Sequence, residues 1–213
     1  MFTDRSQGDL GRHVPAAQLD RRRASIAPLP WTSLDQVHGA VVVQVSHPGH
    51  QHDVEADAAI TTVSGAALSI QTADCAPIAL VAEGGAIAVV HAGWRGLAEG
   101  VIERAVTELR SIAAGPYRAL LGPCIGAECY EFGEGDLEPL IDIFGSAIGS
   151  ATTAGRPALD LPAAVDVALQ REGIVVDRGL WGCTACGGRW YSHRARQEHQ
   201  RQALVAWIEE ESS

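Results

Sequence analysis

The stretch that decides the fold is residues 66–96, AALSIQTADCAPIALVAEGGAIAVVHAGWRG. Three apolar runs, over residues 66–71, 77–82 and 86–90, have the length and composition of buried strands. The turn signal Glu83-Gly84-Gly85 joins the second and third runs, so we expect a β-hairpin there. A short polar loop that ends at Cys75 precedes the hairpin, and His91 closes it.

The hairpin brings Cys75 and His91 to the same open end of the ribbon. A three-residue loop would place the two side chains on one face, whereas a two-residue loop would place them on opposite faces. The sequence leaves this register open. Thiolate and imidazole are both good zinc ligands, so the pair is a candidate metal or catalytic site.

Outside this segment, hydrophobic spacing predicts the remaining elements. Residues 41–45 and 118–121 are expected to be strands. Helices are expected over residues 19–26, 100–113, 137–148, 162–172 and 197–211. Strands followed by clustered helices indicate an α/β fold, a single layered domain over residues 1–213 with mixed sheets.

Composition restricts the function. The chain has 213 residues, 46% hydrophobic residues and a formal net charge of −10, which argues against a nucleic-acid partner. Nothing resembles a secretory signal or a membrane span, so we expect a cytoplasmic protein without membrane contact. All basic side chains are Arg, so lysine Schiff-base chemistry is excluded and anion binding falls to Arg, His or backbone N–H groups.

Two glycines flank Trp94 and Arg95 just after His91. Such a turn lets the backbone approach a ligand closely, with Arg95 as a cationic fork. The alternative is a tight strand–helix connection with Trp94 packed on the core. We favour the ligand-binding interpretation.

The five cysteines are an odd number, so a disulfide framework is not expected. Cys183 and Cys186 have the CxxC spacing of a redox motif or of half a zinc knuckle. Because there is no second CxxC, a structural or incidental role is favoured. Cys124 and Cys129 are expected to be buried thiols.

Several motifs together resemble the YfiH or laccase-domain family. They are QVHG at residues 36–39, TADC at 72–75 and HAGWRG at 91–96. Weaker matches follow in the expected order: ADA around Asp57, LGPCIGAECYE at 121–131, LDL at 159–161, and CTAC and WYSHRAR between 183 and 196. Members of that family have been assigned as polyphenol oxidases, purine nucleoside phosphorylases or peptidoglycan editing factors.

The resemblance implies a fold similar to the catalytic domain of cytotoxic necrotizing factor. It also implies one Zn²⁺ bound by His38, Cys75 and His91, with water as the fourth ligand. Spacing alone would not have assigned His38 to a metal. Copper is disfavoured, because a laccase needs many clustered histidines and often an axial Met, whereas the only Met here is the initiator.

The implied activity is zinc-dependent phosphorolysis of adenosine, inosine, guanosine and methylthioadenosine, together with adenosine deamination. In deamination, a carboxylate such as Asp74 or Glu131 would pass protons while activated water attacks purine C6. The expected partners are therefore a nucleoside and phosphate, and the oligomeric state is left open. The expected catalytic residues are Cys75, His91, Asp74 and Arg95. The expected substrate or phosphate-binding residues are Arg5, Gln36, Gly93, Trp94, Glu131, His193 and Arg194.

Two alternatives remain. The same metal site could cleave an amide in a peptidoglycan precursor such as UDP-muramyl-serine. A metal-free hydrolase could instead use Cys75 as nucleophile and His91 as base, which leaves His38 without a role.

The N-terminus departs from the family pattern. Members usually begin with Phe-(Ser/Thr)-Thr-Arg-x-Gly-Gly and a longer loop. Here Phe2-Thr3-Asp4-Arg5 is recognisable, Gly8 stands alone and the loop is cut to residues 9–14. We expect this arm to help form the substrate pocket, so its departure from the family pattern bears most on substrate preference.

Overall fold

The predicted hairpin is present in the computed structural model, which describes residues 1–209. It consists of β5 (Ala76–Ala82) and β6 (Ala86–Ala92). Ala82 pairs with Ala86, so the loop has three residues, and the same register pairs Pro77 with His91. Cys75 lies two residues before Pro77, so the register directs Cys75 and His91 to one face. The structure therefore settles the hairpin register, which the sequence left open.

The hairpin forms the centre of a six-stranded mixed sheet, ordered β10-β7-β5-β6-β3-β2. Two edge pairs are parallel, β2 with β3 and β10 with β7, and the others are antiparallel. The outer strands are β2 (Val42–Gln44), β3 (Ala58–Thr61), β7 (Tyr117–Leu121) and β10 (Val176–Asp177). These mixed pairings confirm the predicted α/β class.

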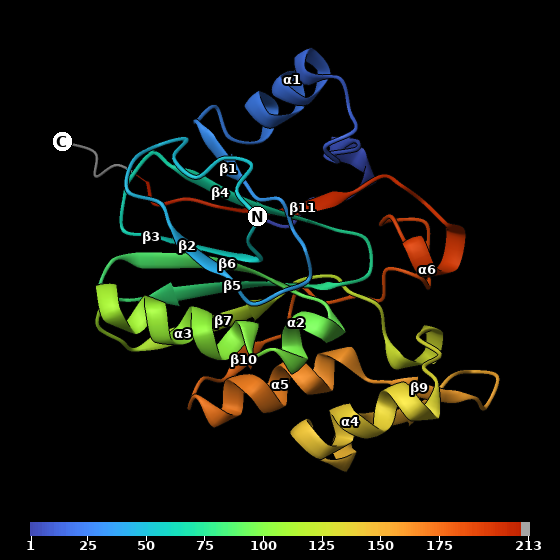
Figure 1. Cartoon of the computed structure of the whole chain (residues 1–213). Coiled ribbons are helices and arrows are strands. Elements are labelled where there is room, and N and C mark those ends of the chain that lie inside the picture. Colours follow the sequence, from blue (N-terminus) through green and yellow to red (C-terminus); the bar gives the residue numbers. More distant parts are fainter. Residues whose placement is uncertain (210–213) are drawn as a thin grey trace.

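A second sheet has three strands in the order β1-β4-β11. They are β1 (Trp31–Ser33), β4 (Ala67–Thr72) and β11 (Gln202–Ala206), and a separate ribbon joins β8 (Gly149–Ala151) to β9 (Pro157–Leu159). Figure 1 shows the two larger sheets stacked, with the N-terminal helix α1 (Ala16–Ile26) beyond the smaller one. Helices α2 (Trp94–Ala98), α3 (Val101–Ile112), α4 (Glu134–Phe144) and α5 (Leu161–Arg171) lie on the far side of the six-stranded sheet, whereas α6 (His193–Arg196) lies beside the sheets.

Alternating side chains of the hairpin pack into two different hydrophobic cores. Ile78 and Val90 belong to the core shared with the helices, whereas Ala79 and Val89 belong to the core between the two sheets. Cys75 and His91 carry odd numbers like Ala79 and Val89, so they lie on the side that faces the smaller sheet. The site therefore forms at one end of the gap between the sheets.

Most predicted helices are confirmed with shifted ends. α1, α3 (Val101–Ile112) and α5 (Leu161–Arg171) match the predicted segments. The predicted helix over 137–148 begins earlier, as α4 (Glu134–Phe144), and stops where Gly145 takes a φ of +88°. Two short helices, α2 (Trp94–Ala98) and α6 (His193–Arg196), complete the set. Within residues 1–209, no helix has both the length and the apolar character needed to cross a membrane.

The helix predicted over 197–211 is wrong. Its described part contains β11, which pairs antiparallel with β4, while residues 210 and 211 lie outside the described range. Leu204 packs between the two sheets, whereas Ala203 and Val205 pack towards α1. Burial on both faces suits a strand that is covered on both sides better than an amphipathic helix, which buries one stripe.

Candidate metal centre

His38, Cys75 and His91 converge from three separate segments. One ligand atom of each, from the two rings and the thiol, lies within 4.8 Å of the others. Cys75 directly precedes β5, His91 lies in β6, and His38 comes from the loop between β1 and β2. The two imidazole rings meet edge to face with centroids 4.9 Å apart. The donor atoms are thus close enough to share one ion.

The backbone of this site is held in conformations that few residues adopt. His38 has a φ of +63° and Asp74, next to Cys75, has a φ of +104°. Both values lie in the left-handed region that disfavours residues with a Cβ. The Asp74 carbonyl accepts a hydrogen bond from Ile125 N at 2.9 Å, which helps to fix that loop. Such conformations cost free energy and concentrate at functional sites.

Asp57 supports two of the three candidate ligands, a role that was not predicted from the sequence. It is fully buried, and its Oδ1 lies 2.7 Å from Nδ1 of His91 and 3.0 Å from the backbone nitrogen of His38. Its other oxygen accepts N–H groups from Val37 at 3.2 Å and Gly39 at 2.7 Å. A carboxylate that orients a ligating histidine is a regular feature of zinc sites. The signal in the sequence was an acidic residue in the apolar run Ala56-Asp57-Ala58-Ala59, where a carboxylate needs partners.

Cys75 and His91 shift each other's pKa. Burial raises the pKa of Cys75, but the nearby positive charge of His91 and hydrogen bonds from His38 and His91 outweigh it and lower the pKa to about 6. Burial lowers the pKa of His91, and the Cys75 thiolate and the Asp57 carboxylate raise it to about 9. Cys75 is therefore an anion at neutral pH, which is the form that binds metals.

Gly93 leaves the space in which the ligands meet. A Cβ at this position would lie 2.9 Å from Cδ2 of His38 and 3.1 Å from Sγ of Cys75. The predicted close approach at this turn is therefore a close approach to the candidate ligands. Arg95 follows at the start of α2, with its guanidinium 4.5 Å from the Trp94 ring centroid.

A cleft of about 900 Å³ opens at the three candidate ligands. This volume is at the upper end of the range typical of small-molecule sites, roughly 300–1,000 Å³. Besides the ligands, its lining includes Gln36, Asp74, Trp94, Arg95, Tyr130, His193 and Arg194. The shortened N-terminal arm contributes Gly11, Arg12 and His13, so it does form part of the pocket.

Two predicted site residues, Arg5 and Glu131, are engaged in structural contacts outside the cleft. Arg5 lies outside the residues that line the cleft; its guanidinium pairs with Glu198 and stacks 4.4 Å from the Tyr191 ring. Glu131 is also outside the cleft lining and pairs with Arg156 at 2.7 Å. Phosphate binding by Arg5 and proton transfer by Glu131 therefore have no geometric support.

Gln36 and Asp74 line the cleft but are engaged in holding loops. The Gln36 amide exchanges hydrogen bonds with the Gln71 backbone at 2.8 and 2.7 Å. The Asp74 carboxylate accepts one hydrogen bond from Thr184 Oγ1 at 2.6 Å and another from Arg194 N at 2.7 Å. These contacts make Asp74 a positioning residue for the Cys75 loop.

Comparison with known proteins gives a consistent result. The family model described as "Multi-copper polyphenol oxidoreductase laccase" matches residues 4–209. A Xylella fastidiosa protein named purine nucleoside phosphorylase is 39% identical over 187 residues, which cover 82% of this chain and 71% of that protein. Purine nucleoside phosphorylase SCO2081 of Streptomyces coelicolor is 32% identical over 205 residues, covering 94% and 84%.

Solved structures agree on the fold. Neisseria meningitidis protein NMB0706, from the family DUF152, superposes with a TM-score of 0.83 at 28% identity, covering 95% of this chain and 86% of that one. The Bacillus licheniformis protein YfiH gives a TM-score of 0.82 at 22% identity, with 94% and 85% covered. The second likeness bears on the fold alone.

Proposed function

Because the chain belongs to the multi-copper polyphenol oxidoreductase laccase family, and relatives in two genera are named purine nucleoside phosphorylase, we propose that it is a zinc-dependent purine nucleoside phosphorylase. The proposal rests chiefly on one observation, the convergence of His38, Cys75 and His91 on a cleft that also presents arginine side chains. Adenosine deamination is proposed as a second activity of the same site.

The three side chains fit a catalytic zinc. Two imidazoles and one thiolate are common zinc ligands, three protein ligands leave one position open, and Asp57 supplies the outer carboxylate. A bound zinc would act as a Lewis acid and provide a nucleophilic water at neutral pH. We infer zinc rather than copper because this centre offers two histidines and no thioether, far fewer ligands than a multi-copper oxidase requires.

Arg95 is the best placed group for phosphate. Its guanidinium lies on Trp94 in the cleft, and within residues 1–209 no ion pair engages it. Arg194 also lines the cleft, but it donates to the Glu131 carbonyl at 2.7 Å and covers the Tyr130 ring at 4.7 Å. Arg95 would hold the phosphate while a phosphate oxygen forms a bond to ribose C1′. The purine would depart with the electron pair of the broken glycosidic bond and take up a proton.

One observation favours a second candidate function. Cys75 and His91, with pKa values of about 6 and about 9, have the charges of a nucleophilic cysteine and its partner in cysteine hydrolases. Such a mechanism gives no role to His38, whose ring lies against that of His91. We therefore place it second.

The test is to incubate purified protein, with its metal content measured, with inosine and with adenosine, each with and without phosphate. Phosphate-dependent formation of ribose 1-phosphate supports the phosphorylase, and phosphate-independent formation of inosine from adenosine supports the deaminase. No turnover of either nucleoside by metal-loaded protein would contradict the proposal and would direct attention to UDP-muramyl-serine as substrate.

A further inference from the structure

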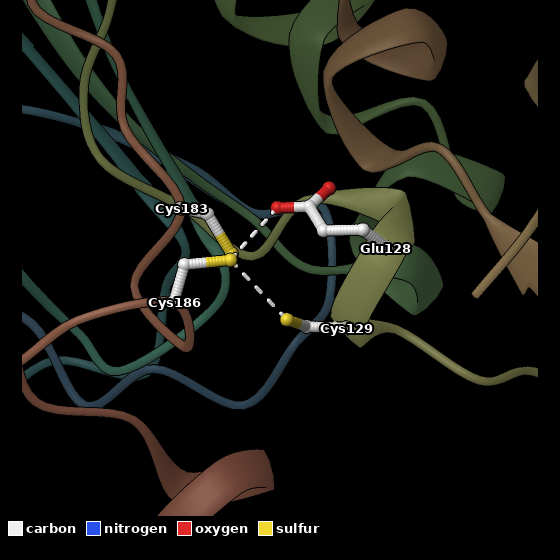
Figure 2. Close-up of side chains that lie close together, drawn as sticks. All are labelled: Glu128, Cys129, Cys183 and Cys186. Atoms are coloured by element: carbon white, nitrogen blue, oxygen red, sulfur yellow. Dashed lines mark hydrogen bonds between the residues drawn. The ribbon is translucent and has the colours of Figure 1, made fainter. Parts of the chain in front are cut away.

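A second group of possible metal ligands lies apart from the three already described. Glu128 and Cys129 lie in the 3-10 turn Ala127–Cys129, and Cys183 and Cys186 form the CxxC pair near the C-terminus. Figure 2 shows the four side chains directed at one another across the two loops. One ligand atom from each lies within 4.8 Å of the other three. The fold thus supplies the two ligands that the isolated CxxC lacks.

The distances within this cluster suit a small cation. Sγ of Cys129 lies 3.4 Å from Sγ of Cys186, which lies 3.1 Å from Oε1 of Glu128. In a tetrahedral zinc site with Zn–S bonds of about 2.3 Å, sulfur atoms are about 3.8 Å apart. Small side-chain rotations would open these contacts to that spacing. Three thiols and a carboxylate also complete a four-ligand set, which is typical of structural zinc.

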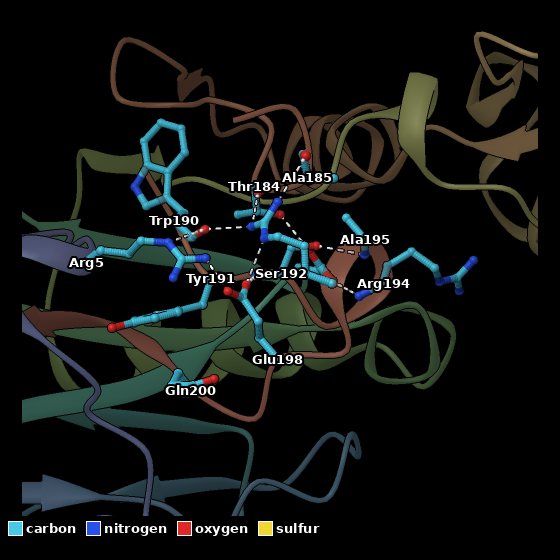
Figure 3. A network of polar contacts seen from close by, with 12 residues as sticks. Arg5, Thr184, Ala185, Trp190, Tyr191, Ser192, Arg194, Ala195, Glu198 and Gln200 are labelled. Atoms are coloured by element: carbon cyan, nitrogen blue, oxygen red, sulfur yellow. Dashed lines mark hydrogen bonds and ion pairs between the residues drawn. The ribbon is translucent and has the colours of Figure 1, made fainter. Parts of the chain in front are cut away.

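The backbone around the cluster is fixed by contacts that do not use the four ligand side chains. Cys183 pairs with Cys124 in a parallel bridge, and Thr184 N donates to the Cys124 carbonyl at 3.2 Å. Arg196 donates to the carbonyls of Thr184 at 3.1 Å and Ala185 at 3.2 Å, the two residues between the cysteines. Figure 3 shows Thr184 and Ala185 within the polar network that also contains Glu198. The CxxC loop is therefore held in place for binding.

Two neighbouring backbone groups further shape the site. Gly126 N donates to Sγ of Cys183 at 3.3 Å, a contact that stabilises a thiolate. A Cβ on Gly126 would collide with the Glu128 carboxylate, so glycine lets that carboxylate fold back over the cluster. Cys129, which we expected to be buried, is partly exposed, and Cys186 is exposed, so an ion can reach them.

We propose that Glu128, Cys129, Cys183 and Cys186 form a second metal site, a structural one, with the donor set of zinc. The site links the loop after β7 to the loop after β10, which are about 57 residues apart in the chain. Thr184, between the two cysteines, donates to Asp74 beside Cys75. The second ion therefore stabilises the loop that supports the candidate metal centre. This inference does not depend on the proposed activity.

The experiment is elemental analysis of zinc per chain in protein purified under reducing conditions. The wild type is expected to hold two equivalents, one for each cluster. The double variant Cys129→Ser/Cys186→Ser should hold one equivalent, and Cys75→Ala should also hold one. Cys124→Ala is the matched control, since Cys124 is fully buried and outside both clusters, and it should hold two.

A second measurement covers the case in which the double variant folds poorly. His38→Ala protein loaded with Co²⁺ should show the intense thiolate-to-cobalt absorption of a site with several cysteines, and Glu128→Gln should weaken cobalt binding by at least about tenfold. Unchanged zinc in the double variant would overturn the proposal. The proposal would also be overturned if the wild type held only one equivalent of zinc and Cys75→Ala lost it. A Cys129–Cys186 disulfide in reduced, zinc-supplemented protein would overturn it as well.

Discussion

The Oδ1 atom of Asp57 lies 2.7 Å from Nδ1 of His91, and both side chains are buried. With Nδ1 engaged in this way, the other ring nitrogen is left for a ligand. The same carboxylate accepts three backbone N–H groups from residues 37–39. Asp57 thus sets the orientation of one candidate ligand and the backbone position of another.

We predict that Asp57→Asn lowers the zinc affinity of the His38–Cys75–His91 centre by about 10–100-fold. The amide can accept from His91, but its NH₂ group then faces the N–H of Gly39, where an acceptor is needed. Chelator competition measures the affinity. Asp166→Asn, which removes a surface carboxylate paired with Arg178, should leave it unchanged. Equal affinities in the two variants would contradict the role assigned to Asp57.

Gly93→Ala should abolish metal binding at the same centre. The new methyl would lie 2.9 Å from the His38 ring and 3.1 Å from the Cys75 sulfur, so at least one donor must move. Gly135→Ala, at a helical position with no atom within 4 Å of the added Cβ, is the matched control. Zinc content reports the result, and full zinc occupancy in Gly93→Ala would show that the site is less crowded than described.

Arg95→Lys should raise the KM for phosphate by about tenfold or more and change the KM for inosine much less, because lysine cannot form the two parallel hydrogen bonds of a guanidinium. Steady-state kinetics with each substrate varied separately checks this. Arg118→Lys, at a position whose side chain is 75% exposed and paired with Glu83, should leave both constants unchanged. A rise confined to the inosine KM would assign Arg95 to the nucleoside.

Glu198 should make stability depend on pH. Its burial raises the pKa, but hydrogen bonds from Arg5, Ser192 N and Arg196 lower it to about 2. A depressed folded-state pKa means that the stabilisation is complete above 4.5, the ordinary pKa of a glutamate, and is lost as the pH falls to about 2. Glu198→Gln should therefore cost about 1–3 kcal/mol in the free energy of unfolding at pH 7 and almost nothing near pH 2.

Urea unfolding at both pH values tests this prediction. Glu83→Gln, in an exposed ion pair with Arg118, serves as control and should change the free energy of unfolding by less than about 1 kcal/mol. If Glu198→Gln lowers the free energy of unfolding equally at pH 7 and pH 2, the charge of the Glu198 carboxylate does not cause the stabilisation, and the prediction is wrong.

The hairpin and the helices with a clear apolar stripe could be predicted because their patterns are local. Whether Cys75 and His91 share a face depends on the length of the hairpin loop. The sequence left that length open, and the structure shows a loop of three residues. The supporting role of Asp57 was not predicted because its partners lie in residues 37–39 and in β6. Only the tertiary structure brings these segments to Asp57. β11 was mistaken for a helix because its pairing with β4 is likewise long-range.

In the candidate site, too, long-range contacts could not be predicted from local sequence patterns. His38 joined it through family resemblance, since a histidine before a glycine carries no metal signal by itself. Arg5 and Glu131 were predicted as substrate ligands from their motifs, but Glu198 and Arg156 engage them instead. The CxxC pair was expected to have a structural or incidental role and was not assigned a metal, because its two further candidate ligands lie far away in the sequence.

The most direct test of the central claim is the rate of phosphate-dependent inosine cleavage by His38→Ala relative to the wild type. A zinc ion held by His38, Cys75 and His91 predicts a loss of at least about 100-fold, beyond the 10–100-fold typical of an outer-shell partner, together with loss of that zinc. A His38→Ala protein that keeps wild-type activity while Cys75→Ala is inactive would contradict the account, because a cysteine nucleophile needs His91 and not His38.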